Sequence, residues 1–226
     1  MATAPVRTYD ALRFVGGRGL RTRIKICGIT REQDAMSATQ LGADAIGFIF
    51  WRPSARYIDP KRAGSIAAEL PAFVTSVCVF VNPTLDEVAA ALDRVPAGTL
   101  QFHGEEPAEF CTRFGRPYIK SVRMKPGIDL VEYFAPYAGA TAWLIDAFDE
   151  RTYGGTGTSF DWNLLPGGLA RPWILSGGLT VNNVTEAARR LRPWAVDVSS
   201  GVESAKGIKD ATKIAAFISG VRNADG

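Results

Sequence analysis

The sequence predicts a (β/α)₈ TIM barrel that forms one domain over residues 24–226. Two observations support this fold: short apolar runs recur eight times, and amphipathic stretches separate them. The runs lack the polar alternation of half-exposed strands, which is typical of parallel strands buried on both faces. They lie at residues 24–27, 45–50, 75–81, 99–102, 118–121, 143–146, 173–176 and 195–199. An open doubly wound sheet is the main alternative, but no strand leads into a G-x-G-x-x-G turn.

Helix signals fall between these runs. Thr30 is placed to cap a helix that Gly42 ends, and Pro60 suits the first turn of the next helix. The acids at residues 105–106 precede a further helix, whose N-terminus favours negative charge. The last helix is expected to begin near Asp210.

Composition and charge exclude several classes of protein. The chain is 46% hydrophobic and 22% charged, which is ordinary for a globular protein. No apolar stretch approaches the roughly 18 residues that span a membrane, and no signal-peptide core is present. We therefore expect a cytoplasmic protein with no membrane partner. Three cysteines and one histidine, without C-x-x-C or H-x-x-x-H spacing, predict neither a disulfide framework nor a metal site.

The N-terminal segment differs from the remainder of the chain. Residues 1–23 contain five arginines and one acid, whereas the formal net charge of the whole chain is only +3. The remainder is therefore close to neutral, which does not favour nucleic-acid binding by a basic face. Residues 1–23 show no clear hydrophobic periodicity, so we expect a flexible N-terminal extension before the barrel.

Polar residues at the ends of two runs are the main candidates for chemistry, because strand C-termini share one mouth in a barrel. Cys27 and Asp146 each end an apolar run, and a thiol with a carboxyl can transfer protons in both directions. Lys25 shares the strand face of Cys27, and its ammonium is expected to lower the thiol pKa towards neutrality. Alternatively, Cys27 is a small buried hydrophobe and Asp146 is a helix cap or an arginine partner.

Three further residues are candidates for substrate contact. Arg56, in the loop after the second run, can fork onto a carboxylate, although a solvated loop arginine is the alternative. His103 ends the fourth run, where it can contact substrate or make a structural hydrogen bond; without a G-x-S-x-G elbow, hydrolysis is not favoured. Asp197 is expected to point into the barrel, where it neutralises Lys25 or orients a sugar.

Small residues after the later runs predict a phosphate site. Glycine lets an anion approach backbone amides, and barrels commonly hold phosphate after strands seven and eight. A purely conformational role for these glycines is the alternative. The candidates are Gly155 after the sixth run, Gly177 and Gly178 after the seventh, and Ser199, Ser200 and Gly201 after the eighth.

Taken in order, these motifs resemble the phosphoribosylanthranilate isomerase family. The resemblance covers nearly the whole chain after residue 23. Its departures are Phe102, where the family usually has leucine, and Cys78, where glycine is common. The matching segments are residues 25–30, 42–48, 54–57, 79–82, 103–105, 154–157, 160–162, 175–179 and 196–203, followed by Gly207, Lys209 and Asp210.

The resemblance implies an Amadori rearrangement in tryptophan biosynthesis, from N-(5-phosphoribosyl)anthranilate to 1-(2-carboxyphenylamino)-1-deoxyribulose 5-phosphate. It implies that Asp146 is the general acid for the furanose ring oxygen and that Cys27 is the general base for the C2 proton. Arg56 would bind the anthranilate carboxylate, and the small-residue turns would bind the phosphate. An iminium intermediate is its own electron sink, so neither a metal nor an organic cofactor is implied.

Other functions stay open from the sequence. The histidine-pathway isomerase also catalyses an Amadori rearrangement but uses an aspartate where Cys27 stands. Indoleglycerol-phosphate synthase needs a lysine and glutamate array that is not found. A catalytically silent barrel that binds a phosphosugar is a further alternative, against which Cys27 and Asp146 together argue. We expect a small phosphosugar as the ligand, and a monomer or a homodimer.

Overall fold

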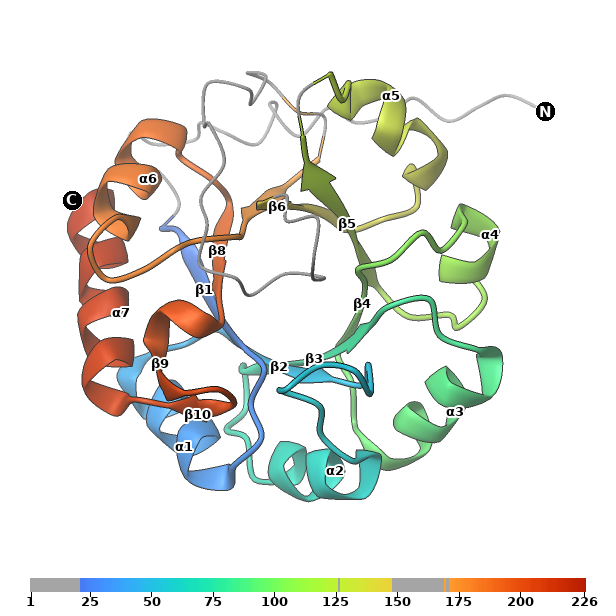
Figure 1. Cartoon of the computed structure of the whole chain (residues 1–226), viewed down its shortest axis with the longest axis horizontal. Coiled ribbons are helices and arrows are strands. Elements are labelled where there is room, and N and C mark those ends of the chain that lie inside the picture. Colours follow the sequence, from blue (N-terminus) through green and yellow to red (C-terminus); the bar gives the residue numbers. More distant parts are fainter. Residues whose placement is uncertain (1–20, 126, 148–168, 170) are drawn as a thin grey trace.

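The computed structural model describes residues 21–125, 127–147, 169 and 171–226, which form a closed barrel of eight parallel strands (Figure 1). The strands follow one another around the barrel in chain order, and β8 pairs with β1 to close it. They are β1 (Arg23–Cys27), β2 (Ala45–Ile49), β3 (Thr75–Phe80), β4 (Thr99–Phe102), β5 (Tyr118–Met124), β6 (Ala142–Ala147), β7 (Trp173–Leu175) and β8 (Ala195–Val198). The predicted fold class and all eight predicted strands are confirmed.

Helices surround the outside of this barrel, as Figure 1 shows. Gly42 ends α1 in the left-handed region, Pro60 begins α2, and the Asp210 carboxylate caps α7, as predicted. Among the described residues, no helix is both long and apolar enough to cross a membrane. The helices are α1 (Glu32–Leu41), α2 (Pro60–Ala68), α3 (Leu85–Arg94), α4 (Ala108–Cys111), α5 (Leu130–Phe134), α6 (Val184–Leu191) and α7 (Ala211–Asp225), with the 3₁₀ turns η2 (Ala135–Tyr137) and η4 (Ser200–Val202).

A hairpin that was not predicted follows η4. It consists of β9 (Glu203–Ala205) and β10 (Ile208–Lys209). The hairpin turn lies close enough to β1 for the Thr30 hydroxyl to donate to the Gly207 carbonyl at 2.6 Å. The prediction that Thr30 caps α1 is therefore wrong, because this tertiary contact takes the hydroxyl and Arg31 occupies the N-cap position.

Alternation of side chains along the strands produces two apolar layers. Outward residues such as Phe102 and Trp143 pack beneath the helices, and the ring of Trp143 stacks on Phe134 with centroids 4.4 Å apart. Inward residues fill one part of the barrel interior with Ile119, Ala142, Leu144, Ile174 and Ala195. Residues further along the same inward face are polar, and these form the candidate site.

The barrel begins slightly before the predicted boundary. Arg23 is already part of β1, and the buried Thr22 bonds the Asp225 carboxylate through its amide (2.9 Å) and its hydroxyl (2.7 Å). These contacts tie the start of β1 to the end of α7. Residues 1–20 lie outside the described residues, so the flexible extension predicted there stays a prediction.

We predict that Phe134→Ala lowers the free energy of unfolding by about 3–5 kcal/mol, because it removes a fully buried ring and its stack on Trp143. Val131→Ala, on the same helix but 65% exposed, should change it by no more than about 0.5 kcal/mol. Urea unfolding followed by circular dichroism measures both. Equal losses in the two variants would contradict this assignment of the core.

Candidate active site

The sequence-predicted residues within the described ranges gather at the C-terminal ends of the strands, here called the mouth. Cys27 is the last residue of β1, Asp146 lies near the end of β6, and His103 directly follows β4. In a closed eight-strand barrel β4 and β6 flank β5, the strand opposite β1. Cys27 therefore lies on one side of the mouth, and His103 and Asp146 lie on the other.

The side of the mouth that holds Cys27 is called the base side, after the role predicted for this thiol, and it contains a buried ion pair. The Lys25 Nζ lies 2.9 Å from the Asp197 Oδ1, and each side chain is 5% exposed. Burial by itself would lower the Lys25 pKa, but attraction by Asp197 and Cys27 outweighs it and raises the pKa to about 12. Lys25 is thus a fixed positive charge, and the predicted neutralisation of Lys25 by Asp197 is confirmed.

The effect of this pair on Cys27 differs from the prediction. Burial raises the pKa of the Cys27 thiol above its ordinary 9.0, and Asp197 adds to the rise. Lys25 opposes both effects but does not overcome them. The expectation of a thiol pKa lowered towards neutrality is therefore wrong, because the lysine is engaged by Asp197 and the sulfur is desolvated.

Glycine is required at two positions beside the thiol. A Cβ added to Gly47 on β2 would lie 2.8 Å from the Cys27 Sγ and 3.1 Å from the Lys25 Cε. A Cβ on Gly28, whose φ is +73°, would lie 2.8 Å from the Arg56 Cδ and 3.0 Å from the Ser199 Oγ. These glycines let the lysine, the thiol and the arginine share the base side of the mouth.

Arg56 is held by an acid that was not predicted. Its Nε and Nη2 donate to the two carboxylate oxygens of Glu203 at 2.7 and 2.8 Å. Lys209 donates to the same carboxylate at 2.9 Å and to the Ser199 carbonyl at 3.1 Å. Burial would raise the Glu203 pKa, but these two cations hold it below its usual value. Within the described residues the Arg56 Nη1 makes no hydrogen bond, so one donor group remains for a ligand.

On the opposite side, called the acid side after the role predicted for Asp146, this residue contacts His103, which in turn contacts Gln101 of β4. The His103 Nε2 lies 3.0 Å from the Asp146 Oδ2, and the His103 Nδ1 lies 3.0 Å from the Gln101 Nε2. All three side chains point inward, because the intervening Phe102 and Ile145 belong to the outer core. Gln101 was not predicted, although its position two residues before His103 places it on the same strand face.

The turns that were predicted to bind phosphate follow β7 and β8, next to the base side of the mouth. Gly177 and Gly178 follow β7 with φ of +84° and +64°, and their amides donate no hydrogen bond within the described residues. Ser199, Ser200 and Gly201 follow β8. A Cβ on Gly201 would lie only 1.9 Å from the Leu179 carbonyl oxygen, so only glycine lets the turns after β7 and β8 approach this closely. Gly155 lies outside the described residues.

A second buried ion pair supports the loop that follows β4. Lys120 donates to Glu106 at 2.8 Å and to the Gly104 carbonyl at 2.6 Å. The Glu106 carboxylate in turn accepts hydrogen bonds from the amides of Asn82 and Gly104. Glu106 was predicted to favour a helix N-terminus, but it lies before α4 and instead holds the backbone next to His103.

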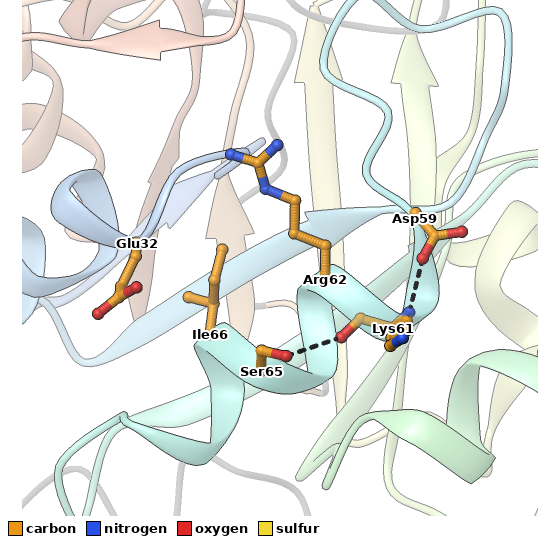
Figure 2. Close-up of a pocket in the computed structure, with 6 residues that line it drawn as sticks. All are labelled: Glu32, Asp59, Lys61, Arg62, Ser65 and Ile66. Atoms are coloured by element: carbon orange, nitrogen blue, oxygen red, sulfur yellow. Dashed lines mark hydrogen bonds between the residues drawn. The ribbon is translucent and has the colours of Figure 1, made fainter.

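Outside the barrel, a groove of about 400 Å³ lies beside α1 and α2 (Figure 2). Figure 2 shows Arg62 and Ile66 of α2 directed towards this groove. None of the predicted site residues lines it, so the groove is separate from the mouth. Its lining residues are Glu32, Asp59, Lys61, Arg62, Ser65 and Ile66.

Comparison with known proteins gives one consistent family. Residues 24–220 match the model of "N-(5'phosphoribosyl)anthranilate (PRA) isomerase". An N-(5'-phosphoribosyl)anthranilate isomerase of Nitrosospira multiformis is 56% identical over 88% of this chain and 96% of its own. The corresponding protein of Dechloromonas aromatica is 52% identical over 91% of this chain and 99% of its own.

Solved structures agree with this match. The phosphoribosyl anthranilate isomerase of Thermotoga maritima superposes with a TM-score of 0.81 and 40% identity, over 90% of this chain and 98% of that one. Another phosphoribosyl anthranilate isomerase, solved with reduced 1-(o-carboxyphenylamino)-1-deoxyribulose 5-phosphate, has a TM-score of 0.75 and 37% identity. That match covers 89% of this chain and 98% of the other.

We predict that Glu203→Gln lowers the free energy of unfolding by about 3–5 kcal/mol, because it leaves the buried Lys209 and the partly buried Arg56 without their anion. Asp93→Asn is the matched control. It breaks an ion pair with Arg94 in which both side chains are more than half exposed, and it should cost at most about 1 kcal/mol. Urea unfolding compares the two variants, and a loss no larger than the control's would contradict a structural role for Glu203.

Proposed function

This chain belongs to the N-(5'-phosphoribosyl)anthranilate isomerase family, and on that premise we propose that Cys27 and Asp146 are its base and its acid. The chain is an isomerase of tryptophan biosynthesis. Its reaction is the Amadori rearrangement of N-(5'-phosphoribosyl)anthranilate to 1-(2-carboxyphenylamino)-1-deoxyribulose 5-phosphate. The observation that carries the proposal is the convergence of the Cys27 thiol and the Asp146 carboxyl on a single barrel mouth.

Asp146 acts first in this proposal. Its carboxyl protonates the furanose ring oxygen, and the nitrogen lone pair of the substrate expels that oxygen from C1 to give an iminium. The side chain is 2% exposed and hydrogen-bonded to His103, so it is held in one position for the transfer. After the transfer, the carboxylate retains the His103 contact.

Cys27 acts second. Its thiolate removes the proton from C2, and the C–H electron pair neutralises the iminium to give an enolamine. Tautomerisation then returns a proton to C1 and leaves a ketone at C2. The positive iminium, like any nearby cation, lowers the pKa of a thiol. The intermediate therefore offsets part of the burial that raises the thiol pKa in the free protein.

The remaining predicted residues are proposed to hold the substrate. The Nη1 of Arg56 is placed to bind the anthranilate carboxylate while Glu203 holds the other donors of the guanidinium. Lys25, His103 and Asp197 are proposed to contact the sugar. The phosphate would bind to the amides at Gly177 and Gly178 and to the turn of Ser199, Ser200 and Gly201, and Gly155 is proposed to add a further amide.

Other features of the protein stay predictions. Retention of both Cys27 and Asp146 disfavours the catalytically silent barrel. We propose a cytoplasmic location, as suits a biosynthetic enzyme, and no nucleic-acid partner. A Thermotoga maritima relative is described as dimeric. For this chain we propose either a monomer or a homodimer.

The direct test is a fluorescence assay for the loss of phosphoribosylanthranilate with purified protein. Wild type should turn over, and Cys27→Ala and Asp146→Asn should each lower kcat by about 10²–10⁴-fold, because each removes a positioned proton-transfer group. Cys111→Ala removes a buried thiol away from the mouth and should leave kcat unchanged. A well-folded wild type without turnover would favour the silent barrel, and near-normal kcat in either variant would remove that residue from its role.

We also predict that kcat/KM of the Asp146→Asn variant rises with pH from 6.5 to 9. This variant is used because it removes the acid group, so that the thiol sets the pH dependence, and the substitutions below are added to it. The base acts as thiolate, and because the folded thiol pKa lies above 9.0, the thiolate fraction grows about tenfold per pH unit over this range. Asp197→Asn should move the rise to lower pH, since it removes a charge that raises the thiol pKa. Lys25→Met should move it to higher pH. Shifts in the same direction, or no shift in either variant, would contradict the proposed base.

A further inference from the structure

The hydrogen bonds of Gln101, His103 and Asp146 determine where the proton on His103 lies. The Gln101 side chain is fully buried, and its amide nitrogen faces the His103 Nδ1 at 3.0 Å. An amide nitrogen has protons to donate and no lone pair to offer, so Nδ1 must be the acceptor. The single N–H of the neutral ring is then on Nε2, which faces the Asp146 Oδ2 at 3.0 Å.

We propose that Gln101 is a positioning residue that holds His103 in its Nε2–H tautomer and so keeps a donor directed at Asp146. This inference rests on the proposed role of Asp146 as the acid. With a proton on Nε2, His103 can donate to Oδ2 in both states of the carboxyl group. It donates to the carbonyl oxygen before proton transfer and to the carboxylate afterwards.

The same hydrogen bond decides which oxygen of Asp146 delivers the proton. Oδ2 accepts from His103, whereas Oδ1 accepts no hydrogen bond within the described residues. The transferable proton is therefore assigned to Oδ1. If His103 instead carried its proton on Nδ1, the lone pair of Nε2 would face Oδ2 and accept the acid's proton. The imidazole would then divert the proton from the sugar ring oxygen.

The oxygen of the Gln101 amide shows which alternative orientation of this side chain has to be tested. Its Oε1 is buried and has no hydrogen-bond partner within the described part of the chain. Half a turn of the amide would present Oε1 to the His103 Nδ1 and would require a proton there. The two orientations place the ring proton on opposite nitrogens, so a measurement of the tautomer distinguishes them.

His103 is the only histidine in the chain, so one ¹⁵N-histidine label reports on this ring alone. A long-range ¹H–¹⁵N spectrum of the full-length protein at neutral pH should show protonated Nε2 and unprotonated Nδ1. Because an ionised Asp146 favours that tautomer by itself, Asp146→Asn isolates the contribution of Gln101. That variant should retain the Nε2–H tautomer, and Gln101→Met combined with Asp146→Asn should give a mixture of tautomers.

Kinetics supply a second readout. Gln101→Met alone should lower kcat about 10–100-fold with little change in KM, as expected when a hydrogen bond to a reacting group becomes unreliable. Gln101→Leu repeats both measurements with a different side-chain shape. Tyr118→Phe is the control, because its buried hydroxyl has no partner within the described residues, and it should change neither readout. Circular dichroism shows whether each variant is folded.

An Nδ1–H ring in wild type would overturn the proposal, and so would an unaltered Nε2–H ring in the double variant. The spectra do not depend on turnover. A normal kcat in Asp146→Asn would therefore refute the acid role of Asp146, whereas the tautomer measurements by themselves decide the role of Gln101.

Discussion

Pairing of β8 with β1 closes the barrel, and this closure places Lys25 directly beside Asp197, although 172 residues separate them in the chain. The pair is buried, so loss of either charge would leave the other in the protein interior without a partner, which is strongly destabilising. The resulting fixed positive charge lies beside Cys27 and sets one side of the mouth. The other site residues face one another only because β1 and β8 pair in this register.

The two sides of the mouth differ in charge and in the way that they hold a proton. On the base side, three cations surround the thiol, but Asp197 and Glu203 engage them, so burial still raises the thiol pKa. On the acid side, the His103 imidazole joins Asp146 to the buried amide of Gln101. The proposed chemistry fits this contrast, because in it the iminium supplies a positive charge at the step in which Cys27 acts as the base.

Support for the mouth comes from segments outside the strands. The β9–β10 hairpin brings Glu203 and Lys209 to Arg56, and the pair of Lys120 and Glu106 holds the backbone that follows β4. These buried charged groups are fully paired, as a low-dielectric interior requires. They hold Arg56 and the backbone next to His103 in place at the C-terminal ends of the strands.

The sequence by itself determined the eight strands, the barrel and the strand-end positions of Cys27 and Asp146. Parallel strands buried on both faces are continuous apolar runs, and their ends are visible where those runs stop. Only the tertiary structure decided that Glu203 holds Arg56, that His103 reaches Asp146, and that the Cys27 pKa is raised. Each of these depends on the distance between distant segments or on the sum of burial and opposing charges, and neither quantity is encoded in local spacing.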